Sequence, residues 1–125
     1  GELAEELRRG HVYVTGSQNE PGSNHQNEGA LCGLPLLYLD SASMPEYCSG
    51  FGLSYDEDSF EERLEQMFEE YGRLQRRMPK YPFTAARTCA AWADLFEKLA
   101  ERRDELTAHR PVPSGLRALL YKLAP

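Results

Sequence analysis

Two short apolar runs, separated by a polar loop and a short helical stretch, constrain the fold of this chain most strongly. Val12, Tyr13 and Val14 follow one another without alternating with polar residues, and the run 36–39, Leu-Leu-Tyr-Leu, does the same. Such runs are typical of strands buried on both faces of a parallel sheet. The order strand, loop, helix, strand is that of a βαβ unit, so the sequence predicts parallel strands over residues 11–16 and 35–39.

The rest of the chain extends this unit into an α/β domain. The sequence predicts a third strand over residues 52–55 and a helical C-terminal part, which together make a partial Rossmann-like parallel sheet of about three strands with flanking helices. Helices are expected over residues 3–9, 24–32, from Ser43, from Ser59 to Pro79, and over 84–106 and 116–123. Residues at helical spacing are predicted to be buried, namely Phe60, Leu64, Met67, Phe68, Tyr71 and Leu74 in the first long helix and Cys89, Trp92, Phe96 and Leu99 in the second.

Composition excludes several classes of protein. The 125 residues carry a net charge of -6, which disfavours a nucleic-acid partner. No apolar stretch approaches the roughly 20 residues of a transmembrane helix. Cys32, Cys48 and Cys89 are odd in number and widely spaced, which argues against a disulfide framework or a zinc site. Buried free thiols in a reducing cytoplasm are therefore expected.

Candidate functional residues gather in the first loop and the helix after it. Glu20 and Glu28, eight positions apart, mark the two ends of this loop-helix step. Loops 17–24 and 40–46 follow neighbouring parallel strands, so both are expected at the rim where α/β sheets bind ligands. A carboxylate accepts two hydroxyl hydrogen bonds and suits a vicinal diol, while helix-start amides at Asn24 suit phosphate or sugar oxygens.

The two glutamates, with seven residues between them, belong to a longer pattern. Pro21-Gly22 follows the first glutamate, and Gly-Leu-Pro at residues 33–35 follows the second. This pattern resembles a known signature. It is the donor-site motif of retaining glycosyltransferases of the two-domain GT-B fold, family 4 in style. The segment 40–47, Asp-Ser-Ala-Ser-Met-Pro-Glu-Tyr, resembles the next block of that family, and the resemblance covers roughly residues 10–100.

The resemblance implies a substrate and roles for named residues. The donor is a nucleotide-diphosphate sugar, with no metal and no cofactor. Glu20 is the catalytic residue that contacts the transferred hexose, and Glu28 holds the ribose hydroxyls. The substrate-binding set is Glu20, Pro21, Gly22, Ser23, Asn24, His25 and Glu28, with amides of Gly22, Ser23 and Asn24 near the sugar or diphosphate. From its position at the start of the helix, His25 is either a donor to phosphate or a partly exposed neighbour of the cap.

The resemblance also implies that the chain is incomplete. Residues 1–110 match only the later half of a donor-binding domain, and residues 111–125 are expected to be a linker and a short helix. The basic residues that hold the diphosphate, and the acceptor domain, are expected upstream, so this chain alone should bind donor weakly. An unprotected sheet edge at strand 11–16 or 35–40 is expected, and with it either the missing half or a homo-oligomer as partner.

Two other functions stay open at this point. The first is a non-catalytic interaction module that uses the acidic helices after residue 56. The second is a GT-B-like sugar-nucleotide epimerase or phosphorylase. On these alternatives Glu20 is a solvated loop residue, Glu28 compensates the helix dipole, and Glu46 caps a short helix in an S-x-x-E capping box with Ser43.

Overall fold

The computed structural model describes residues 1–22 and 24–109. It contains, in chain order, α1 (Glu2–Leu7), β1 (Tyr13–Thr15), α2 (His25–Leu31), β2 (Leu36–Leu39), α3 (Met44–Cys48), β3 (Gly52–Tyr55), α4 (Phe60–Gln75), the 3₁₀ helix η1 (Met78–Lys80), α5 (Ala85–Glu101) and α6 (Arg103–His109). The chain divides into two compact units, Gly1–Ala85 and Ala86–Pro125. The predicted linker and helix over 111–125 lie outside the described residues, so the boundary expected there stays a prediction.

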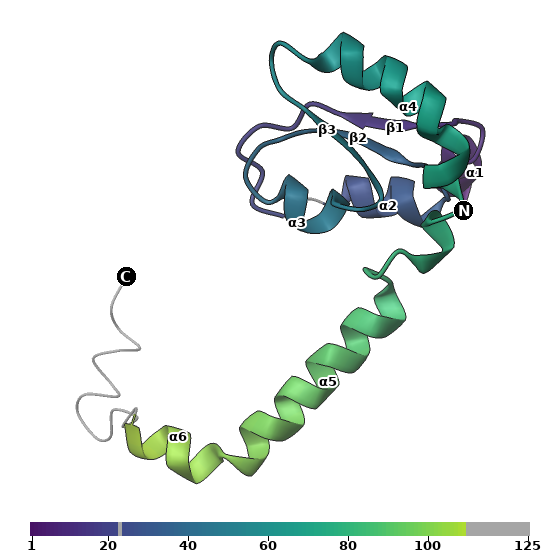
Figure 1. The fold of residues 1–125 in the computed structure, drawn as a ribbon. Coiled ribbons are helices and arrows are strands. Elements are labelled where there is room, and N and C mark those ends of the chain that lie inside the picture. The colour runs from purple at the N-terminus through teal and green to yellow at the C-terminus, as the bar shows by residue number, and fades with distance from the viewer. Residues whose placement is uncertain (23, 110–125) are drawn as a thin grey trace. The chain divides into compact units, whose positions relative to one another are not determined.

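The first unit is built on a three-stranded parallel sheet in the order β1-β2-β3 (Figure 1). Tyr13 is paired with Leu36, and Leu36 with Gly52. The predicted α/β fold with three parallel strands is therefore confirmed, and the third strand has the expected bounds. Among the described strands β1 is an edge, as expected for strand 11–16, whereas β2 is central, so the alternative of an edge at 35–40 is wrong.

Helices cover both faces of this sheet, α4 on one side and α2 with α3 on the other (Figure 1). Leu36 belongs to the core on the α2 and α3 side, with Ala30, Met44 and Cys48, and Leu37 belongs to the core on the α4 side, with Met67 and Leu74. Both leucines are fully buried. Each such burial contributes about 1.5–3 kcal/mol, which explains why β2 is apolar without alternation.

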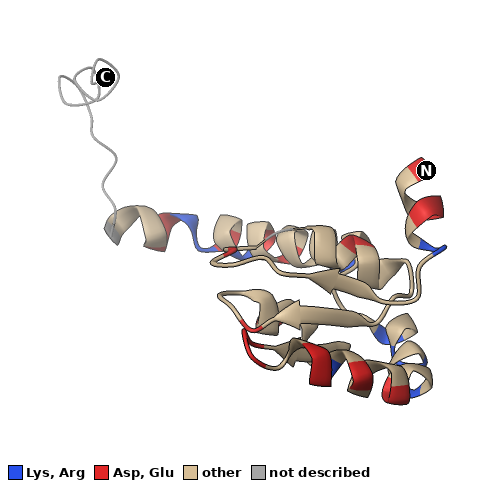
Figure 2. Ribbon diagram, turned by 90° about the horizontal axis from the view of Figure 1, so that it is seen from above, with Lys and Arg blue, Asp and Glu red and all other residues tan. Residues whose placement is uncertain are grey.

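The predicted core face of α4 is correct at Met67 and Leu74, which are buried. It is wrong at Phe68, which is 66% exposed, and at Phe60 in the first turn, which is exposed as well. Consecutive helical residues point about 100° apart, so Phe68 turns away from the sheet that Met67 contacts. Glutamates lie along most of α4, and its last turn carries the basic Arg73 (Figure 2). The Ser59 hydroxyl donates to Asp56 Oδ1 at 2.5 Å and makes no side-chain cap, so the S-x-x-E spacing of Ser59 and Glu62 forms no capping box.

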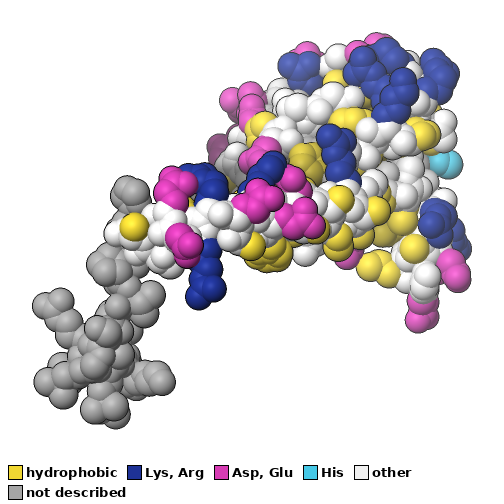
Figure 3. All heavy atoms as spheres, turned by 90° about the horizontal axis from the view of Figure 1, so that it is seen from below, with side chains coloured by type: hydrophobic (Ala, Val, Ile, Leu, Met, Phe, Trp, Pro, Cys, Tyr) yellow, Lys and Arg dark blue, Asp and Glu magenta, His cyan; other side chains and the backbone are white. Residues whose placement is uncertain are grey.

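The second unit departs more from the prediction. The helix expected over 84–106 is two helices, α5 and α6, with a turn at Arg102. No residue of α5 is buried, so the predicted buried face is wrong: Trp92 is 54% exposed and Phe96 60%, and Cys89 and Leu99 are exposed as well. Within residues 86–109 only these two successive helices are present, and they supply no second layer. Hydrophobic and charged side chains therefore lie open on different sides of this helix (Figure 3).

The three cysteines differ in their surroundings. Cys48 is buried, as predicted, Cys32 is half-buried and Cys89 is exposed, so burial of all three was wrong. Burial raises the pKa of the Cys48 thiol to about 12. In the part of the chain that is described, no helix is both long and apolar enough to cross a membrane.

Replacing Gly29 by alanine should destabilise the first unit, because a Cβ there would lie 2.5 Å from the ring of Tyr13. Overpacking of this kind costs about 1–3 kcal/mol. Gly72 is the matched control: it also lies in a helix, and its Cβ would meet only the flexible end of Arg76 at 3.4 Å. Gly72→Ala should stabilise by about 0.5–1 kcal/mol. Urea unfolding measures both, and equal effects of the two changes would contradict the packing.

The thiols should react in the order of their exposure. At neutral pH a disulfide reagent should modify Cys89 first and Cys32 more slowly. It should modify Cys48 only when the domain unfolds. Burial blocks access to this thiol and raises its pKa to about 12, so the thiol is protonated at neutral pH. Mass spectrometry of the time course measures this order. Cys89→Ser should remove the fast phase alone, and early labelling of Cys48 would contradict the core described for it.

Candidate functional site

The loops that follow β1 and β2 are joined by hydrogen bonds at the carboxyl edge of the sheet. The Asn19 N–H donates to Ser41 Oγ at 3.0 Å. Ser43 donates to the Glu20 carbonyl twice, from Oγ at 2.7 Å and from its N–H at 3.4 Å. The loop that carries Glu20 is thus fixed to the start of α3. This bond also uses the Ser43 hydroxyl, so the predicted capping box with Glu46 does not form.

Both loops contain residues in left-handed backbone conformations. Asn19 has φ 53° and Ala42 has φ 49°. This region is sparsely populated by residues with a side chain and costs an alanine roughly 1–2 kcal/mol. Gly22 has φ 154°, a conformation that L side chains rarely adopt, and a Cβ there would lie 3.4 Å from Tyr47 Oη. The hydrogen bonds between the loops hold the chain in these strained positions.

The two glutamates occupy different surroundings. Glu20 is half-buried in the loop after β1. Glu28 is exposed in the first turn of α2, and its charge adds to burial in raising the pKa of Tyr13. An open hollow of about 440 Å³ lies beside Glu28, lined also by Leu31 and Cys32 of α2 and by residues of α1. Glu20 is not among the residues that line this hollow.

His25 connects β1 to the loop after it. Its Nδ1 lies 3.2 Å from the Tyr13 hydroxyl and its Nε2 lies 3.1 Å from Ser17 Oγ. Thr15 Oγ1, which is buried, donates to Ser17 Oγ at 3.2 Å. Both ring nitrogens of His25 therefore have partners inside the protein. A direct bond from His25 to a phosphate, one of the two roles expected from its position in the sequence, would have to replace one of them.

The sequence did not single out Tyr13, Thr15 or Ser17. The available signal was the spacing of Tyr13 and Thr15, since alternate residues of a strand project from the same face, whereas Ser17 lies in the loop after β1. Asn24 is the residue before α2, as predicted, but its side chain makes no capping bond. Pro21 and Gly22 are exposed in the same loop, whereas Ser23 lies outside the described residues.

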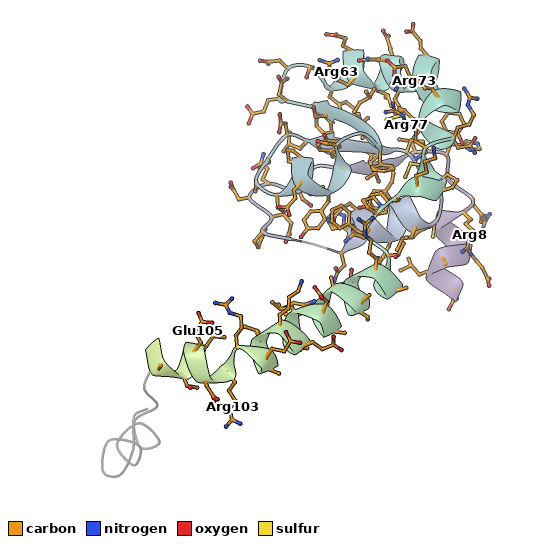
Figure 4. The ribbon with its side chains drawn as sticks, turned by 60° about the horizontal axis from the view of Figure 1, so that its bottom comes forward. Arg8, Arg63, Arg73, Arg77, Arg103 and Glu105 are labelled. Atoms are coloured by element: carbon orange, nitrogen blue, oxygen red, sulfur yellow. The ribbon has the colours of Figure 1, made fainter. Side chains whose placement is uncertain are left out.

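Basic side chains come from other parts of the first unit. The arginines labelled there in Figure 4 belong to the turn after α1 (Arg8), to α4 (Arg63 and Arg73) and to the turn after α4 (Arg77). Arg77 donates to the Gly50 carbonyl at 3.2 Å. The segments 16–24 and 40–43 themselves contain no lysine or arginine. Hydroxyls, backbone groups and carboxylates are thus the chemistry that these loops offer.

Comparison with protein-family models, with curated proteins and with solved structures found no match to this chain. Among the described residues, no group of three or more His, Cys, Asp or Glu side chains is arranged to hold a metal ion.

Removing the Ser43 hydroxyl should loosen the joined loops. Ser43→Ala loses the 2.7 Å bond to the Glu20 carbonyl and should lower the free energy of unfolding by about 1 kcal/mol. Amide exchange of residues 19–22 should become faster. Ser49→Ala is the control, because the Ser49 hydroxyl is exposed and lies 3.5 Å from its nearest partner, Tyr38; it should change stability by less than about 0.5 kcal/mol. Unchanged exchange in Ser43→Ala would contradict the role given to this bond.

Proposed function

We propose that this chain is the donor-binding portion of a retaining GT-B glycosyltransferase, which transfers a hexose from a nucleotide-diphosphate sugar. The observation that carries the proposal is the joining of the two rim loops through the Glu20 carbonyl and Ser43. The loops after neighbouring parallel strands form the usual ligand site of α/β sheets. The two-glutamate motif lies in the first of these loops and in the helix directly after it.

On this proposal the two carboxylates have separate tasks. Glu20 holds hydroxyls of the sugar so that the anomeric carbon stays aligned with the acceptor. Glu28 holds the ribose hydroxyls from its exposed position in the first turn of α2. Binding energy gained at the ribose positions the reacting end of the donor.

The proposed reaction needs cationic groups near the diphosphate, and the two rim loops do not supply them. As the bond to the sugar breaks, negative charge grows on the diphosphate, and cationic side chains usually stabilise it. The rim loops carry none, so we expect weak donor binding and little transfer by the chain alone. The missing groups would come from an upstream half or from another subunit. The three free cysteines favour a reducing compartment, which is the ground for proposing the cytoplasm.

A second candidate function is a non-catalytic interaction module on the same scaffold. The exposed stripe of Trp92, Leu95, Phe96 and Leu99 on α5 favours it, because large apolar patches on a surface are typical of interaction sites. The two candidates differ in what substitution does. Loss of Glu20 and Glu28 should abolish donor binding by a transferase and change nothing in an interaction module.

Replacing Glu28 should weaken nucleotide binding strongly. Loss of a charged hydrogen bond costs roughly 1.5–3 kcal/mol, so Glu28→Ala should reduce affinity for a nucleoside diphosphate about ten- to hundredfold. Glu20→Ala should keep most of that affinity, since its partner is the sugar. Two-dimensional NMR titration with ADP, GDP and UDP measures weak dissociation constants on this chain.

Glu65→Ala is the matched control for this titration. Glu65 is exposed on α4, on the face of the sheet opposite α2, and its removal should leave binding unchanged. Equal affinity of Glu28→Ala and the unmodified chain would remove the ribose assignment. Absence of binding by all three nucleotides at millimolar concentration would count against a donor site altogether.

A further inference from the structure

Four side chains form a continuous hydrogen-bonded row at the end of β1. Tyr13 and Thr15 belong to the strand, Ser17 to the loop after it and His25 to the start of α2. The row runs from the Tyr13 hydroxyl through both nitrogens of His25 to Ser17 Oγ. Ser17 Oγ also accepts a hydrogen bond from the Thr15 hydroxyl. The rings of Tyr13 and His25 are stacked with their centroids 5.9 Å apart, which holds the imidazole in place.

The chemistry of the members decides which way the protons point. A neutral imidazole has one donor and one acceptor nitrogen, and the partner of each fixes the tautomer. A phenol is a better donor than acceptor, and burial together with the Glu28 charge raises the pKa of Tyr13, so its proton stays in place. Tyr13 then donates to Nδ1, and His25 donates from Nε2 to Ser17. Ser17 Oγ accepts from Thr15 and His25, and its own proton is left to point outward.

We propose that Ser17 is a donor-binding residue, whose hydroxyl is aimed at an oxygen of the diphosphate or sugar by the row of Tyr13, His25 and Thr15. This inference rests on the proposed function for the identity of the ligand. Ser17 belongs to the same loop as Glu20 and is half-buried, and the bonds to Thr15 and His25 fix its oxygen. Tyr13 and His25 act through Ser17 and are positioning residues, in contrast to the direct phosphate contact expected for His25 from the sequence.

The tautomer of His25 can be measured without any ligand. Long-range proton–nitrogen NMR spectra of the chain should show a proton on Nε2 and none on Nδ1. Tyr13→Phe, which keeps the ring but removes the hydroxyl, should turn His25 into a mixture of both tautomers. Tyr71→Phe is the matched control. The ring of Tyr71 packs against a different histidine of this unit, His11, with the ring centroids 6.0 Å apart. A proton on Nδ1 in the unmodified chain would overturn the direction assigned to the row.

The binding role is tested by titrating the same proteins with ADP, GDP and UDP. Ser17→Ala should weaken binding of the nucleotide that binds tightest by about ten- to hundredfold, as for one hydrogen bond to a charged oxygen. Tyr13→Phe should weaken it by about two- to fivefold, and Tyr71→Phe should not change it. If the unmodified chain binds the nucleotide and Ser17→Ala binds it equally well, this inference is overturned and the proposed function stands. No binding by the unmodified chain would overturn both.

Discussion

The burial of β2 on both faces is the interaction on which the rest of the first unit depends. Leu36 and Leu37 point to opposite sides of the sheet and are completely buried, one under α2 and α3 and the other under α4. Parallel pairing with β1 and β3 then places the carboxyl ends of successive strands at one edge. The joined loops depend on this central strand, because one of them follows β1 and the other follows β2 itself.

The candidate site combines a rigid base with a strained loop pair. Ser41 accepts a hydrogen bond from the loop after β1, and Ser43 donates one to it. Each of the two joined loops contains a residue in a left-handed conformation, Asn19 in the first and Ala42 in the second. Strain of this kind persists only when surrounding contacts hold it, and it clusters at ligand sites. The same loop carries Glu20 and Ser17, so bonds between loops fix the backbone while the side-chain row fixes a hydroxyl. A site arranged in this way binds with little reorganisation, which favours affinity and alignment.

The sheet could be predicted from the sequence because its signal is local. An apolar run without alternation fits a strand covered on both faces, and β2 is such a strand. The common rim of the two loops followed from parallel topology alone. The buried face of α5 could not be predicted correctly, since spacing defines an apolar stripe but says nothing about a partner, and residues 86–109 supply none. Ser43 was expected to cap its own helix, but a carbonyl 23 residues earlier competes for the hydroxyl. The row at His25 depends on side-chain rotamers across 12 residues and leaves only a weak trace in sequence.

The most direct test of the account is a crystal structure of this chain with the nucleoside diphosphate that binds it tightest. The account predicts the ribose hydroxyls within hydrogen-bond distance of the Glu28 carboxylate. It also predicts the diphosphate against the loop between β1 and α2, with Ser17 Oγ directed at one of its oxygens. A nucleotide bound at another surface, with Glu28 and Ser17 both away from it, would contradict the central claim that these joined loops form a donor site.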